Sequence, residues 1–233
     1  LDGKYPISIL EWANEKYICL YSANKSFNSK RTIMKDYSTK NIINLALTGH
    51  ATTGKTTLAE AMACNSGIID KMGSIDDGST ISDYREHEIQ YQHSISLTLL
   101  NLEWQEKKIN ILDAPGYLDF HGEVKSAMRV ADLAGIVLSA TDGIDIGTEL
   151  CTTYADKDYK IPKLFIINMA DKDQADFDSV LAALQERYGR IVFPFTIPVN
   201  PGPGFNQVAD VLRKETFTFK TDGSGNYSEV EPE

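Results

Sequence analysis

Short apolar runs recur along the chain at intervals that suit buried β-strands. Most of them are bounded by glycine, asparagine, aspartate or proline and are too short for helices. A continuous apolar run is typical of a strand that is covered on both faces of a sheet. The pattern predicts strands at residues 41–47, 94–103, 108–112, 135–140 and 164–168. In the strand predicted at 94–103, apolar and polar residues alternate, so Ile95, Leu97 and Leu99 are expected on one buried face.

Helical patterns separate most of these strands. Residues 56–64 are rich in good helix formers, residues 147–155 follow the fourth strand, and residues 173–188 carry apolar side chains at helical spacing. Strands that alternate with helices give a mostly parallel sheet with helices on both faces. We therefore predict an α/β protein, with a further extended segment at 191–199.

Two regions do not follow this alternation. Residues 65–93 are polar and have no sustained periodicity, so we expect a long and mobile loop of the kind that often carries function. After residue 200, a Pro-Gly-Pro-Gly tetrapeptide precedes Thr216–Lys220, which alternates like an edge strand, and a turn is expected at 222–226. This change of character indicates the start of a second element.

Charge separates the first residues from the rest. Residues 1–33 contain five Lys or Arg and three Asp or Glu, whereas the whole chain carries a formal net charge of −10. We predict that residues 1–33 are an extension outside the domain, with the native start at Met34. Residues 34–200 are then one domain, and residues 201–233 are the beginning of an inserted subdomain.

Composition excludes some classes of protein. The chain has 42% hydrophobic and 24% charged residues, which is typical of a soluble globular protein. The acidic balance argues against a surface that coats nucleic acid. No apolar run approaches the roughly 18 residues that a membrane helix needs. We expect a cytoplasmic protein without membrane contact.

The strongest chemical signal follows the first predicted strand. Residues 49–56 match the pattern Gly-x-x-x-x-Gly-Lys-Thr between a strand and a helix, which predicts the P-loop NTPase fold. Glycines let backbone N–H groups surround phosphate oxygens, and the helix N-terminus adds positive potential. Lys55 is expected to reach the β- and γ-phosphates, and the Thr56 hydroxyl to bind Mg²⁺. The predicted nucleotide-binding residues here are Gly49, His50, Ala51, Thr52, Thr53, Gly54, Lys55, Thr56 and Thr57.

Two further motifs follow other strands. Asp113-Ala-Pro-Gly116 lies where open α/β sheets place ligands, so the Asp113 carboxylate can hold Mg²⁺ and the Gly116 N–H can bond a γ-phosphate. Asn168 and Asp171 belong to a motif at the end of the strand predicted at 164–168. Their amide and carboxylate suit guanine, because the carboxylate accepts two N–H donors that adenine lacks. The three motifs together favour GTP over ATP.

With these motifs in this order, the chain resembles the GTPase domain of translation factors, and elongation factor G in particular. The resemblance covers about residues 34–220 and includes Asp113–Phe120, similar to the family's Asp-Thr-Pro-Gly-His-Val-Asp-Phe, and Gly143–Glu149. It implies a GTPase that the ribosome activates during elongation, with GTP or GDP bound and Mg²⁺ as cofactor; we expect a monomer. It also implies two switch loops, at about 67–95 and 114–122, that GTP holds and hydrolysis releases.

The resemblance also implies individual roles, and several positions depart from the family. The implied catalytic residues are Lys55, Gly116 and Tyr117, and the implied Mg²⁺ ligands are Thr56, Ser94 and Asp113. Tyr117 stands where the family has the histidine that orients the attacking water, and a phenol with a pKa near about 10 stays neutral and mainly donates. Hydrolysis that is slowed is one interpretation, and Tyr117 packing beside Leu118 without a catalytic role is the other.

Other departures affect the rim of the site. Ser94 keeps the hydroxyl of the family's threonine, but Tyr91-Gln92-His93 replaces Arg-Gly-Ile. Met169 replaces a lysine that contacts the nucleotide-binding loop, and Thr52 replaces an aspartate. His93, in the polar segment, is expected to be solvated. Binding chemistry is therefore retained, and hydrolysis chemistry is altered.

Four functional hypotheses remain open at this point. The first is GTP hydrolysis coupled to translocation or another ribosomal step. The second is a GTP-binding conformational switch with little hydrolysis. Ribosome-protection and release-factor GTPases share the same core, and an ATPase or kinase with a phosphate-binding loop is the alternative from another class.

Overall fold

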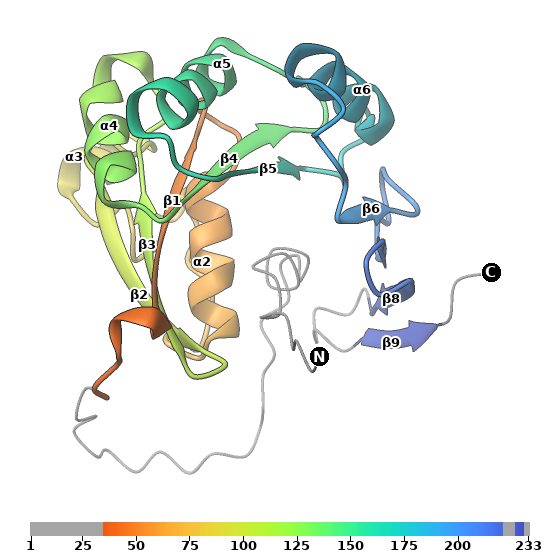
Figure 1. Ribbon diagram of the computed structural model, residues 1–233. Helices are drawn as coiled ribbons and strands as arrows, with labels where there is room; N and C mark the ends of the chain where they lie inside the picture. The colour runs from red at the N-terminus through yellow and green to blue at the C-terminus, as the bar shows by residue number, and fades with distance from the viewer. Residues whose placement is uncertain (1–34, 221–226, 231–233) are drawn as a thin grey trace.

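The computed structural model describes residues 35–220 and 227–230, which form two β-sheets with helices packed on the larger one (Figure 1). The larger sheet has the strand order β2-β3-β1-β4-β5. All neighbours in it are parallel except β2 and β3, which form an antiparallel pair. Its strands are β1 (Ile42–Gly49), β2 (Thr98–Trp104), β3 (Lys107–Asp113), β4 (Leu133–Ser139) and β5 (Lys163–Asn168). The predicted mostly parallel sheet is confirmed.

The register of the sheet brings the predicted motifs to one edge. Leu47 of β1 pairs with Asp113 of β3, and Ser139 of β4 pairs with Asn168 of β5. The carboxyl ends of parallel strands meet at the same edge, where α/β proteins bind ligands. The phosphate-binding pattern begins there at Gly49, the last residue of β1.

Helices cover both faces of the larger sheet, as predicted. Helix α2 packs on one face, where Ala59, Met62 and Ala63 join a buried cluster with Leu45 and Leu47 of β1. Helices α4, α5 and α6 contribute buried side chains to clusters on the other face. Full burial of a leucine side chain stabilises the fold by roughly 1.5–3 kcal/mol. The bounds of these helices are α2 (Lys55–Asn65), α4 (His121–Val130), α5 (Ile146–Thr153) and α6 (Phe177–Tyr188).

The buried face of β2 is the opposite of the predicted one. Leu100 and Leu102 are buried, whereas Leu99 is 59% exposed. The strand begins at residue 98 rather than 94. Before it begins, the backbone N–H of Leu97 donates to the Glu123 side chain instead of a neighbouring strand. The apolar residues that were used to choose the face therefore lie partly outside the strand.

Helices also depart from the predicted bounds. The polar segment at 65–93 contains a short helix, α3 (Glu86–Tyr91), rather than loop alone. Helix α6 begins at Phe177 because the Asp176 side chain accepts a hydrogen bond from the Ser179 N–H and caps it. After α5 the chain continues into a π-helical turn, Tyr154–Tyr159.

The smaller sheet is antiparallel and has the order β6-β7-β8-β9. Its strands are β6 (Thr196–Pro198), β7 (Gln207–Asp210), β8 (Glu215–Phe219) and β9 (Tyr227–Val230). β8 pairs with strands on both sides, so the prediction of an edge strand at Thr216–Lys220 is wrong. Within the extended segment predicted at 191–199, β6 joins this sheet and not the larger one.

Some predictions fall outside the described residues, namely the extension at 1–33 and the turn at 222–226. The domain boundary at residue 200 stays a prediction. Across residues 35–220 and 227–230, no helix has both the length and the apolar character needed to cross a membrane.

Candidate functional site

The predicted phosphate-binding loop connects β1 to α2 through unusual backbone angles. Gly49, Thr52 and Gly54 have φ values of 134°, 64° and 84°. At Gly49, a Cβ atom would lie 2.1 Å from the Val137 carbonyl oxygen, so a side chain has no room there. Gly54 precedes the first residue of α2, which brings the free N–H groups of the helix N-terminus to this loop.

Lys55 lies at the base of this loop. Its side chain is buried, and the Nζ atom donates a hydrogen bond to the His50 carbonyl oxygen, which also accepts one from the Thr53 hydroxyl. Burial lowers the pKa of Lys55, because the charged ammonium loses hydration. A Cβ atom on Gly116 would lie 2.5 Å from this Nζ, so the Asp113–Gly116 motif contacts the loop directly.

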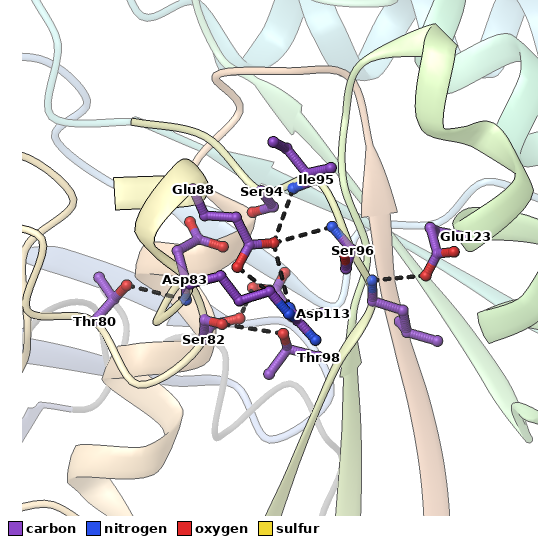
Figure 2. Close-up of polar contacts among 12 residues, drawn as sticks. Thr80, Ser82, Asp83, Glu88, Ser94, Ile95, Ser96, Thr98, Asp113 and Glu123 are labelled. Atoms are coloured by element: carbon purple, nitrogen blue, oxygen red, sulfur yellow. Dashed lines mark hydrogen bonds and ion pairs between the residues drawn. The ribbon is translucent and has the colours of Figure 1, made fainter. Parts of the chain in front are cut away.

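The three predicted Mg²⁺ ligands form one hydrogen-bonded group. The Thr56 hydroxyl donates to Asp113 Oδ2 over 2.9 Å and lies 3.1 Å from the Ser94 hydroxyl. Ser82, which the sequence did not single out, donates to the same Asp113 oxygen over 2.6 Å. Figure 2 shows Ser82, Ser94 and Asp113 converging from separate segments. Hydroxyl and carboxylate oxygens are the ligands that Mg²⁺ prefers.

Two buried carboxylates at this point have oxygens without a hydrogen-bond partner. These are Oδ1 of Asp113 and both side-chain oxygens of Asp83. Burial raises the pKa of Asp113 to about 6, although hydrogen bonds from Ser82 and Thr56 lower it. Burial also raises the pKa of Asp83. Because buried carboxylate oxygens are normally paired, these atoms fit a site that receives a cation.

Three glutamates hold the backbone beside this group. The Glu60 side chain accepts hydrogen bonds from the N–H groups of Gly73 and Ile81. Glu88 Oε1 accepts hydrogen bonds from the N–H groups of Ile95 and Ser96 (Figure 2). The Glu123 side chain accepts a hydrogen bond from the N–H group of Leu97. We refer to residues 73–97 as the anchored segment.

Glu88 has the most enclosed of these carboxylates. It is fully buried, and burial by itself would raise its pKa, but its two backbone hydrogen bonds and its contact with Arg85 lower the pKa overall. The Arg85 Nη1 atom lies 3.2 Å from Glu88 Oε2. Glu88 therefore stays ionised at neutral pH, when it holds the backbone of the anchored segment most strongly.

A cavity of about 500 Å³ separates the phosphate-binding loop from the anchored segment. This volume lies within the range of small-molecule sites. The residues that line the cavity come from distant parts of the chain. Its lining residues are Ala51, Thr52, Gly54, Lys55, Thr56, Thr57, Gly73, Ser74, Ile75, Asp76, Asp83, Gln92, His93, Ser94, Gly116, Tyr117 and Met169.

The predicted base-recognition residues differ in position. Asn168 is buried, and its Nδ2 atom donates to the Thr53 carbonyl oxygen over 2.9 Å, so it supports the loop from behind. Met169 has a φ of 62° and lines the cavity. Asp171 is exposed and is not among the described residues that line the cavity.

His93 and Tyr117 meet at the edge of the cavity. Their ring centroids lie 4.7 Å apart, and both residues line the cavity. The expectation that His93 is solvated is wrong, because its ring packs among aromatic rings and is only partly exposed. Tyr117 is 41% exposed.

Similar proteins are known for this arrangement of residues around the cavity. Residues 40–224 match the elongation factor Tu GTP binding domain, which covers more than half of the chain. The chain belongs to this family. It is thus a translation-factor GTPase domain, and the predicted P-loop NTPase fold is confirmed.

Among the relatives of this GTPase domain are several elongation factors. The chain is 31% identical over 192 residues to elongation factor G of Mycoplasma genitalium and 34% identical over 189 residues to elongation factor G 2 of Treponema pallidum. It is 31% identical over 204 residues to the mitochondrial ribosome-releasing factor 2 of Anopheles gambiae. These alignments cover 82%, 81% and 88% of the chain but 28%, 28% and 27% of the respective relatives.

A solved structure shows the same arrangement. A crystal structure of a protein from Thermus thermophilus superimposes with a TM-score of 0.76 at 30% identity. The match covers 82% of this chain and 28% of that one. The chain therefore spans less than a third of the length of the relatives that it matches.

Sequence reasoning assigned no contact to several residues of the anchored segment, where the polar composition predicted only a loop. Asp83 and Gln92 line the cavity, and Ser82 contacts Asp113. The available signal was weak, because single aspartates and serines are common in loops. Only the folded segment shows which of them face Asp113.

Proposed function

We propose that this chain is the GTP-binding and GTP-hydrolysing domain of an elongation factor G-like protein that acts on the ribosome during translation elongation. The observation that carries the proposal is the cavity bounded by the phosphate-binding loop on one side and by Ser94 of the anchored segment on the other. Membership in the GTP-binding family and the similarity to elongation factors G support it.

Different residues around the cavity would bind different parts of the nucleotide. Backbone N–H groups of residues 49–56 and the Lys55 ammonium would bind the phosphates. Asn168 would hold the phosphate-binding loop through the Thr53 carbonyl oxygen, and Asp171 would pair with guanine. Of these residues, Asp171 would have to move furthest when the nucleotide binds, because it lies outside the lining of the cavity.

A magnesium ion fits the group formed by Thr56, Ser94 and Asp113. Thr56 and Ser94 offer hydroxyl oxygens, and Asp113 offers a buried oxygen that has no other partner. In residues 35–220 and 227–230, no group of three or more His, Cys, Asp or Glu side chains is able to hold a metal alone. This agrees with Mg²⁺, which is usually held by one or two carboxylates together with substrate phosphates. When bound, the ion neutralises charge on the phosphates.

The second half of the proposal concerns the ribosome and the rest of the protein. We propose that GTP holds the segments at about 67–95 and 114–122 and that hydrolysis releases them to change ribosome contacts. In this proposal the domain spans residues 34–200, a second subdomain starts at 201, and the protein works as a monomer in the cytoplasm. The elongation factors G among its relatives support this assignment.

Nucleotide affinity tests the proposal at its base. Fluorescent GTP, GDP and ATP analogues are titrated into the chain with and without Mg²⁺. Micromolar or tighter binding of GTP and GDP and roughly 100-fold weaker binding of ATP are expected, because Asp171 would pair with guanine N–H donors that ATP lacks. Lys55→Ala is expected to abolish binding, Asp171→Asn to remove the preference for guanine, and Lys172→Ala at an exposed neighbouring position to change neither.

Ribosome stimulation tests the finer part of the proposal. In the longer protein that contains this chain, purified ribosomes are expected to raise GTP turnover by orders of magnitude, as activators do for related GTPases. Tight GTP binding without stimulated turnover favours the second candidate, a conformational switch with little hydrolysis. The observation behind that candidate is Tyr117, a partly exposed phenol at the family's histidine position.

A further inference from the structure

We propose that His93, in the anchored segment, binds and orients the water that attacks the γ-phosphate of GTP. This rests on the proposed GTPase function and adds a residue to it. The family histidine is absent from position 117, where this chain has tyrosine. The structure brings a different histidine to the same end of the cavity, from a segment 24 residues earlier in the chain.

The position of His93 is the first argument. It lines the cavity together with Lys55, Gly116 and Tyr117. A Cβ atom on Gly116 would lie 2.5 Å from the Lys55 Nζ, so Gly116 and the residue after it lie at the end of the cavity where Lys55 would meet the γ-phosphate. A water between that phosphate and the His93 ring would be on the side from which attack occurs.

A backbone contact determines the tautomer of the His93 imidazole. The Nδ1 atom of His93 lies 3.3 Å from the carbonyl oxygen of Ser94. A carbonyl oxygen only accepts hydrogen bonds, so in the neutral ring the proton is on Nδ1 and the Nε2 lone pair is free to accept. An acceptor is what orients an attacking water, whereas the phenol of Tyr117 mainly donates.

Three aromatic rings surround the ring of His93. Its centroid lies 4.7 Å from that of Tyr117, 6.0 Å from that of Tyr91 and 6.2 Å from that of Phe120. Aromatic rings at these distances attract one another, so the three neighbouring rings favour one position of the imidazole. Tyr117 therefore acts as a positioning residue, and its ring matters more than its hydroxyl.

The reaction step follows from these positions. An O–H group of the water donates a hydrogen bond to Nε2 of His93. This hydrogen bond turns a lone pair of the water oxygen toward the γ-phosphorus. The new bond joins this oxygen to the γ-phosphorus, and the bond from the γ-phosphorus to the bridging oxygen breaks. GDP leaves with the electron pair of that bond, and the proton that the water loses passes through the phosphate to solvent.

Single-turnover hydrolysis of GTP by the chain in excess tests the proposal, with the GTP dissociation constant measured in parallel. His93→Ala is expected to slow hydrolysis roughly tenfold or more and to change GTP affinity less than about threefold, because the lost contact is made to the water alone. His93→Gln keeps an acceptor near the Nε2 position and is expected to stay within about threefold of the wild-type rate. His87→Ala, at an exposed position of α3, is the matched histidine control.

Variants at position 117 separate positioning from packing. Tyr117→Phe keeps the ring and is expected to slow hydrolysis less than Tyr117→Ala. Tyr117→Ala is expected to lower the rate as far as His93→Ala, without an additive effect in the double variant. The exchange His93→Ile with Tyr117→His moves the imidazole back to position 117. It is expected to restore hydrolysis that His93→Ile alone removes.

Each failure has its own meaning. A His93→Ala variant that hydrolyses GTP at the wild-type rate overturns the role of His93 and leaves the proposed function intact. A His93→Gln variant as slow as His93→Ala, at unchanged GTP affinity, also overturns it. A wild-type chain that binds no GTP overturns the proposed function, and one that binds GTP but never hydrolyses it overturns the role of His93 and supports the switch.

Discussion

The phosphate-binding loop and the anchored segment face each other across one cavity, yet different interactions hold them. The loop at residues 49–56 depends on backbone geometry, with glycines at Gly49 and Gly54 and hydrogen bonds to the His50 carbonyl oxygen. The anchored segment depends on side-chain carboxylates that accept hydrogen bonds from its N–H groups. Two of these carboxylates, those of Glu60 and Glu123, lie outside the segment, so its own sequence does not fully determine its conformation.

The difference shows how one site combines a fixed half with a releasable half. A loop built from its own backbone keeps its shape when the ligand changes. A segment held by a few carboxylates can be released by small energies, because each bond of this kind contributes about 1.5–3 kcal/mol. This agrees with a nucleotide-dependent switch on the side that carries His93 and Ser94.

The largest effect is expected when the fixed half is changed. Gly49→Ala places a Cβ atom 2.1 Å from the Val137 carbonyl oxygen at a φ of 134°, so it is expected to lower the free energy of unfolding by about 3 kcal/mol or more. Urea denaturation measures the loss. Gly67→Ala, also at positive φ but with nothing within 4 Å, is the control and is expected to cost about 1 kcal/mol. Equal costs at the two positions would contradict the steric argument.

A change in the releasable half is expected to act locally. Glu88→Ala leaves the N–H groups of Ile95 and Ser96 without partners, so hydrogen exchange at these two amides is expected to speed up roughly 30-fold. Exchange at residues 49–56 should stay as in the wild type. Glu86→Ala, at an exposed position of the same helix, is the control. Faster exchange throughout the domain would show that the two halves are not separable.

A smaller effect is expected at the base end of the cavity. Met169→Lys places an ammonium beside the phosphate-binding loop, near Gly54, and is expected to tighten GTP binding about three- to tenfold through attraction to the polyanion. Met169→Leu keeps an apolar side chain and is expected to bind as the wild type does. Titration with fluorescent GTP at two salt concentrations measures both. A gain that salt does not reduce would argue against an electrostatic cause.

The smallest effect is expected outside both halves. Asp176→Ala removes the cap of α6 and is expected to lower Tm by roughly 2–4 °C at neutral pH with no change in GTP binding. The hydrogen bonds from Ser179 lower the pKa of Asp176. Because the pKa of Asp176 is lower in the folded state than its unfolded value of 3.8, the ionised carboxylate stabilises the fold at pH values above 3.8. The difference in Tm should therefore disappear as the pH falls through the folded pKa and the carboxylate is protonated. Asp178→Ala, in the same turn, is the control, and a difference that persists in acid would contradict the cap.

Prediction from the sequence succeeded where a pattern is local. The strands of the larger sheet and the loop at 49–56 are each encoded by a run of adjacent residues, and the structure contains them. The face of β2 was predicted wrongly because Leu99, Leu100 and Leu102 offer two possible phases, and only packing against α2 and β3 selects one. The sequence of β2 alone does not determine which of its faces is buried.

The same limit explains the part of the site that stayed hidden. His93 and Ser82 lie in a polar segment without periodicity, and their partners Tyr117 and Asp113 are distant in the chain. The sequence by itself determined the phosphate-binding loop, because glycine spacing and the strand before it act over a few residues. Only the tertiary structure decided that His93 reaches Tyr117 and that Asp113 meets Ser82, because those contacts require the sheet edge and the anchored segment to be assembled together.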